Sequence, residues 1–94
     1  MENLFDTKKE LITKLKTAED KLSKTKNELK TKENDLWLNT PFKKLGYTND
    51  DTRRAYVNNE TSQLKLDEEL LNNEIRMLKR ELNLCDDKIK LVTF

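Results

Sequence analysis

Residues 57–92 read VNNETSQLKLDEELLNNEIRMLKRELNLCDDKIKLV, a stretch whose seven-residue apolar repeat decides the fold of the chain. One row of this repeat consists of Val57, Leu64, Leu71, Leu78, Cys85 and Val92. The row that completes the seam consists of Ile75, Leu82 and Ile89. Because a seven-residue apolar repeat is typical of helices that pack side by side, the pattern predicts a long coiled-coil helix over about 49–92.

A third apolar row lies directly beside the first and widens the apolar face of this helix. It also repeats every seven residues and consists of Leu70, Met77, Leu84 and Leu91. A seam between two helices needs only two rows, so we expect this helix to contact more than one neighbour. These four residues are therefore predicted to join copies of the chain into a dimer or a higher oligomer.

Residues 4–38 carry a narrower version of the same repeat. Its main row consists of Leu15, Leu22, Leu29 and Leu36, and its matching row begins with Leu4, Leu11 and Ala18. The matching row continues through Thr25 and Lys32, so the seam weakens toward its C-terminal half. A narrow stripe suits a single partner helix. The pattern predicts a first helix over about 4–38 that folds back against the second.

The repeat stops between these two segments, and residues 39–48 are predicted to form a tip. Thr40 precedes Pro41, which disfavours continued helix, and Gly46 suits the left-handed end of a short helical turn over about 41–45. Thr48 or Asn49 is expected to cap the second helix, and the acidic residues that follow suit the positive end of its dipole.

The fold class that follows is all-α: one domain over residues 1–94, built as an antiparallel coiled-coil hairpin that assembles into an oligomeric helical bundle. Charged residues make up 39% of the chain and hydrophobic residues 34%, with one glycine and one proline. That balance suits long solvated helices better than a compact globule. A chain of 94 residues rarely builds a large core alone, which favours self-association.

Catalysis and metal binding lack the residues that they need. The chain has no histidine and one cysteine, so the common catalytic triads and zinc sites cannot be assembled. We expect no enzyme activity, no metal and no cofactor. Cys85 lies in an apolar row and is interpreted as a small buried hydrophobe; the alternative is an oxidative cross-link between two copies in a parallel dimer.

Membrane and nucleic-acid functions are also disfavoured. No apolar run approaches the ~18 residues that span a bilayer, and no N-terminal signal sequence is recognisable. The formal net charge is +1 and shows no polybasic patch for a specific nucleic acid. The sequence therefore predicts a cytoplasmic protein.

The tip gathers aromatic and basic side chains. They are Trp37, Phe42, Lys43, Lys44, Tyr47, Arg53, Arg54 and Tyr56. One interpretation is a structural plug, with Leu45 joining the aromatic rings and the two arginines pairing with Asp50 and Asp51. The other is a surface that binds a protein partner or an anionic ligand such as a nucleotide, since guanidinium groups beside rings suit stacking and bidentate contacts.

Residues 46–57 read GYTNDDTRRAYV between two heptad helices. This stretch resembles a pattern found in small helical-hairpin proteins of Gram-positive phages and mobile elements, most of which have no assigned activity. The resemblance covers the tip and the start of the second helix. It implies a small effector made in the host cytoplasm during infection, an inhibitor of a host or defence protein.

Three functions remain open from the sequence. The first is an oligomeric coiled-coil interaction protein that binds another protein through its tip or its second helix. The second is an oligomer that captures a nucleotide or another anion at the tip. The third is a structural spacer.

Overall fold

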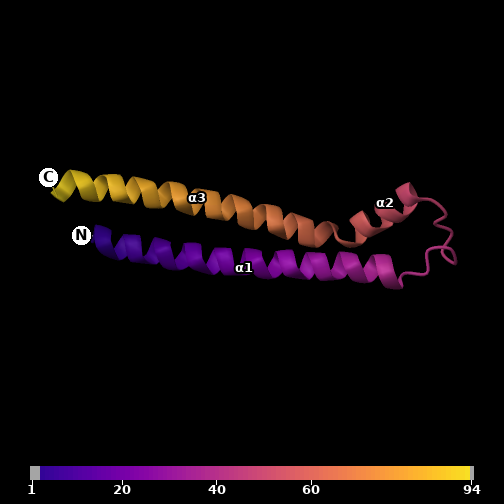
Figure 1. The fold of residues 1–94 in the computed structure, drawn as a ribbon. Helices are drawn as coiled ribbons and strands as arrows, with labels where there is room; N and C mark the ends of the chain where they lie inside the picture. Colours follow the sequence, from indigo (N-terminus) through magenta and orange to yellow (C-terminus); the bar gives the residue numbers. More distant parts are fainter. Residues whose placement is uncertain (1–2, 94) are drawn as a thin grey trace. The chain divides into compact units, whose positions relative to one another are not determined.

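The computed structural model describes residues 3–93, which form three helices and no strand. These are α1 (Leu4–Asn39), α2 (Asp50–Glu60) and α3 (Ser62–Thr93) (Figure 1). The predicted all-α fold with two long helices is confirmed. Contacts divide the chain into two compact units, which we name the terminal unit (Met1–Ser23 with Glu69–Phe94) and the tip unit (Lys24–Glu68).

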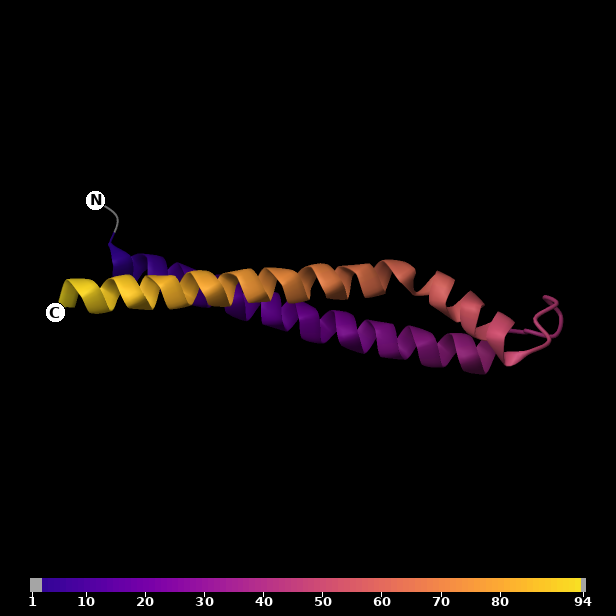
Figure 2. The same ribbon diagram turned by 90° about the horizontal axis from the view of Figure 1, so that it is seen from above.

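In the terminal unit, α1 and α3 pack side by side in opposite directions, so that the start of α1 lies beside the end of α3 (Figures 1 and 2). The buried cluster consists of Leu11, Ala18, Ile75, Leu78 and Cys85, and the partly buried side chains packed against it are Leu15, Leu22, Leu82 and Ile89. All nine belong to the seam rows of the heptad repeat. Burial of these rows is the main force that holds the two helices together.

Lys8 of α1 and Asp86 of α3 form an ion pair between the two helices of the terminal unit. Lys8 Nζ lies 2.7 Å from Asp86 Oδ1. The hydrogen bond to this carboxylate, followed by its charge, raises the pKa of Lys8 above the ordinary value of 10.5. The favourable contribution of the pair is therefore present below that value and is lost as the pH rises through the raised pKa.

The second helical segment is broken at Thr61, so the prediction of one uninterrupted helix over 49–92 is wrong. Thr61 has φ −104° and ψ 3°, and both its N–H and its hydroxyl donate to the Val57 carbonyl, at 3.0 and 2.8 Å. A threonine hydroxyl bonded to the preceding turn competes with the backbone ladder and bends helices. The side chain is fully buried, and α3 begins at the next residue (Figure 1).

Lys65 bridges the break and the facing helix within the tip unit. Its Nζ donates to Asn58 Oδ1 at 2.9 Å, and it lies 3.7 Å from Glu33 Oε1 on α1. Both partners of the ion pair are more than one third exposed, so the pair contributes at most about 1 kcal/mol. The Lys65 contacts therefore add little to the stability of the tip unit, and their main effect is to link the residues around the break to α1.

The connection between α1 and α2 follows the predicted punctuation. Leu45 N donates to Pro41 O at 3.2 Å, which closes a single turn, and Gly46 ends this turn with φ 87°. Of the two predicted caps, Asn49 is the one that the structure uses: its side chain accepts from Thr52 N at 2.8 Å.

Gly46 is a site where only the backbone conformation restricts the residue type. A Cβ added there meets nothing within 4 Å, so steric contacts add no cost. Gly46→Val is expected to lower the free energy of unfolding by about 1–2 kcal/mol, because a β-branched residue disfavours positive φ. Gly46→Asn is the control and should lose less than half as much, since Asn tolerates this region. Equal losses in urea unfolding would contradict the assignment.

Candidate binding surfaces

The four aromatic side chains of the tip form one cluster around Phe42, which is only 8% exposed. Its ring centroid lies 5.7 Å from Trp37, 6.0 Å from Tyr56 and 6.3 Å from Tyr47. The two tyrosine rings are 5.1 Å apart. Tilted and edge-on rings at these distances attract one another beyond simple burial. The aromatic part of the predicted plug is therefore present.

Leu45 does not join this plug. Its side chain is 53% exposed, and Trp37 and Leu38 are 42% and 82% exposed. Leu45 lies in the turn that Gly46 closes, and this turn places it at the surface. The tip unit consequently presents apolar side chains to solvent beside its aromatic cluster.

Arg53 packs on the cluster instead of pairing with the neighbouring acids. Its Nε donates to the Tyr47 carbonyl at 3.2 Å, and its Cζ lies 5.6 Å from the Phe42 ring centroid, within cation–π range. Among the described residues, no ion pair joins Arg53 or Arg54 to Asp50 or Asp51, so that part of the plug interpretation is wrong.

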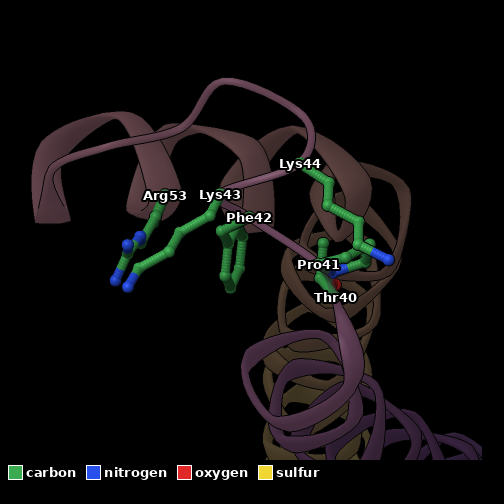
Figure 3. Close-up of a pocket in the computed structure, with 6 residues that line it drawn as sticks. All are labelled: Thr40, Pro41, Phe42, Lys43, Lys44 and Arg53. Atoms are coloured by element: carbon green, nitrogen blue, oxygen red, sulfur yellow. The ribbon is translucent and has the colours of Figure 1, made fainter.

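A pocket of about 370 Å³ opens beside the Phe42 ring. Its lining consists of Thr40, Pro41, Phe42, Lys43, Lys44 and Arg53 (Figure 3). The Lys43 and Arg53 side chains extend in the same direction on one side of the ring, whereas Lys44 lies on the other side (Figure 3). The sequence patterns gave Thr40 and Pro41 roles only in ending the first helix and in starting the short turn, and nothing in the sequence marks them as pocket walls.

Arg54, the remaining basic residue of the predicted tip surface, is exposed and lies outside this pocket. Successive residues of a helix point about 100° apart, so only one of two adjacent arginines can lie against Phe42. The structure therefore brings Lys43 and Arg53 together, places Lys44 on the other side of the Phe42 ring, and leaves Arg54 outside the pocket.

The third apolar row of α3 is uncovered in the terminal unit. Leu70 is 57% exposed, Met77 63%, Leu84 55% and Leu91 81%. A second pocket, of about 230 Å³, lies where this row meets the seam between α1 and α3. Its lining consists of Leu4, Thr7, Leu11, Glu81, Leu84, Cys85 and Lys88.

Two exposed apolar residues on α1 were not singled out in the sequence. Phe5 is 56% and Ile12 47% exposed, and they are seven residues apart, next to Leu4 and Leu11 of the seam. The same seven-residue spacing that marks the third row of the second helix could have identified them.

Cys85 is buried, with 5% exposure, as its place in the apolar row predicts. Its Sγ donates to the Leu4 carbonyl at 3.4 Å, which places the thiol inside the seam of the terminal unit. A thiol covered by its own chain cannot reach the same residue of a second copy unless the unit opens.

Residues 3–93 contain no group of three or more His, Cys, Asp or Glu side chains that could hold a metal ion. Over the same range, no helix is long and apolar enough to cross a membrane. Comparison of the chain with protein-family patterns, with curated proteins and with solved structures gives no match.

Proposed function

We propose that this chain is a non-enzymatic coiled-coil interaction protein that assembles with copies of itself through the third row of α3. The observation that carries this proposal is the exposure of Leu70, Met77, Leu84 and Leu91, each more than half exposed. Contiguous exposed apolar surface is typical of an interaction site. A chain that served only as a spacer would gain nothing from it.

The third row suits a second helix because it has the period of a helix seam. Its four residues extend along about 31 Å of α3, at about 1.5 Å per residue, and all lie in the terminal unit. The adjacent 230 Å³ pocket offers a hollow for a side chain of the partner helix. Knobs that repeat every seven residues beside a hollow are the arrangement found in helical bundles.

The charges of α3 do not set the orientation of the second copy. Residues 69–81 carry three acidic and three basic side chains, and residues 82–93 carry two of each. A two-fold contact through the third row is isologous and closes as a dimer in either orientation.

Light scattering on reduced protein tests this assembly. Leu70→Glu with Met77→Glu places two negative charges in the row and is expected to weaken self-association by about 30-fold or more, because burying an unpaired charge is costly. The expected result is an oligomer for the original chain and a monomer for the double variant.

Asn72→Glu with Asn83→Glu is the matched control. Both positions are exposed on α3 outside the row, and the change adds the same charge. This variant should keep the mass of the original oligomer. A monomeric original chain, or a control that dissociates equally, would refute assembly through the third row.

The tip unit supplies the second part of the proposed function. Trp37, Leu38 and Leu45 present apolar area to a partner, and exposed aromatic side chains are enriched at protein interfaces. The resemblance of residues 46–57 to phage hairpin proteins supports a partner of one kind, a host or defence protein that the assembly inhibits.

A further inference from the structure

We infer that the tip unit binds a small phosphate-bearing anion in the pocket beside Phe42. This inference goes beyond the proposed self-assembly and does not depend on it, since every lining residue belongs to the tip unit and the third row to the terminal unit. Its basis is the geometry of Arg53, the unpaired charges of two lysines, and the size of the pocket.

Arg53 is held in place while most of its donors stay available. The Nε bond to the Tyr47 carbonyl and the cation–π contact with the Phe42 ring, at 5.6 Å from Cζ to the ring centroid, hold the guanidinium group in place. A guanidinium group carries five N–H donors, and the carbonyl uses one of them. Its terminal amino groups therefore form a preoriented fork, which matches two oxygens of a phosphate.

Lys43 and Lys44 add two positive charges that no carboxylate neutralises. Among the described residues, neither of them nor Arg53 takes part in an ion pair. Lys43 extends beside Arg53, so that their charged groups lie on the same side of the Phe42 ring (Figure 3). Lys43 and Arg53 together attract a ligand of two or three negative charges more strongly than they attract a single carboxylate, and Lys44 adds a third positive charge from the other side of the ring.

The pocket is of a size that fits a small ligand. Its volume of about 370 Å³ lies near the lower end of the usual range for small-molecule sites, about 300–1,000 Å³, but it is a shallow depression, so a bound ligand stays partly exposed to solvent. The lining is mainly apolar, and Thr40, Pro41 and Phe42 belong to it. A diphosphate, free or carried by a nucleoside, combines the charge and the size that this lining recognises.

The chain contains its own reporter of binding. Trp37 is the single tryptophan, and its ring centroid lies 5.7 Å from that of Phe42. An anion that settles beside Phe42 is expected to change the tryptophan fluorescence. Titration with pyrophosphate at constant ionic strength should give a saturable change, whereas sodium chloride added to the same ionic strength should give none.

Two adjacent arginines provide a matched pair of variants. Arg53→Gln is expected to weaken pyrophosphate binding about 10-fold or more, because it removes a charged bidentate contact. Arg54→Gln removes the same charge from a residue outside the pocket and should change the affinity by about 2-fold or less. Equal losses in the two variants would show general attraction to positive charge and would overturn the site.

Lys43→Gln with Lys44→Gln tests the site without touching the aromatic cluster. Both side chains are exposed, so the double variant should fold as the original chain does and still bind pyrophosphate about 10-fold or more weakly. Unchanged affinity, or no saturable signal with the original chain up to about 10 mM pyrophosphate, would overturn the inference.

Adenosine diphosphate and adenosine distinguish the two sources of the phosphate. If adenosine diphosphate binds about 10-fold more tightly than pyrophosphate, the ligand is a nucleotide, whose base adds contacts to the aromatic cluster. Equal affinities would assign the phosphate groups alone. Adenosine that binds as well as adenosine diphosphate would overturn recognition of phosphate.

Discussion

Replacing Phe42 with alanine is expected to lower the free energy of unfolding of the tip unit by about 3–5 kcal/mol. Phe42 is 8% exposed and contacts three aromatic rings and the Arg53 guanidinium group. Its removal leaves a cavity at the centre of the cluster and takes away the ring on which Arg53 rests. No other side chain of the tip contacts as many of its neighbours in this cluster.

Urea unfolding followed by Trp37 fluorescence measures this loss, because the tryptophan lies against the substituted ring. Leu45→Ala is the control: it also removes an apolar side chain from the tip, but one that is 53% exposed. It should lower the free energy of unfolding by about 1 kcal/mol or less. Similar losses in the two variants would mean that Phe42 does not organise the cluster.

Leu11→Ala is expected to lower the free energy of unfolding of the terminal unit by about 2–5 kcal/mol. Leu11 is 7% exposed and belongs to the buried cluster that joins α1 to α3. The neighbouring Ile12 is 47% exposed, and Ile12→Ala should cost about 1 kcal/mol or less. Alanine is also the better helix former, which offsets part of that loss.

Thermal and urea unfolding followed by circular dichroism compare these two variants, which differ by one position along the same helix. A large difference between them is the signature of a seam with one buried side. If Ile12→Ala lowered the free energy of unfolding as much as Leu11→Ala, the result would contradict a seam with one buried side. Another helix would then have to cover Ile12 in solution.

The extent of the helices could be read from the sequence because it depends on neighbours along the chain. The seven-residue period located both long helical segments, and Pro41 with Gly46 located the turn between them. The sequence offered Thr48 and Asn49 as the N-terminal cap of the helix that follows the tip, and in the structure Asn49 caps α2. Dihedral preferences and capping bonds act within a few residues, so they are visible in the order of residue types.

The break at Thr61 could not be read in this way. Thr13 and Thr17 make the same hydroxyl bond to the carbonyl four residues before, at 3.0 Å each, and α1 continues through both. Thr61 differs in being fully buried, whereas those two are exposed. The residue type and its hydroxyl bond therefore do not identify the position of the break, since both are shared with threonines at which the helix continues.

The candidate pocket was predicted in part. The clustering of aromatic and basic residues in the sequence identified the tip, but it did not distinguish Arg53 from Arg54. One interpretation paired both arginines with Asp50 and Asp51, and the other placed both on a binding surface. Arg53 instead donates a hydrogen bond to the Tyr47 carbonyl and makes a cation–π contact with Phe42. Whether Arg53 or Arg54 faces the Phe42 ring depends on how the turn at 41–46 positions that ring against α2. This position is set by the tertiary structure and cannot be read from the order of the residues.

The sequence by itself determined that the chain is helical, where its long segments turn, and that one helix carries more apolar surface than a single partner helix needs. Those properties follow from period, capping and composition, which are local. Only the tertiary structure decided that the third row stays uncovered in the single chain, that the Cys85 thiol donates to the Leu4 carbonyl, and that Lys43 and Arg53 lie together beside Phe42. Each of these three properties depends on contacts between residues that are distant in the chain or lie on different helical turns. Such contacts determine which side chains are buried and which groups pair, and they form only in the folded chain.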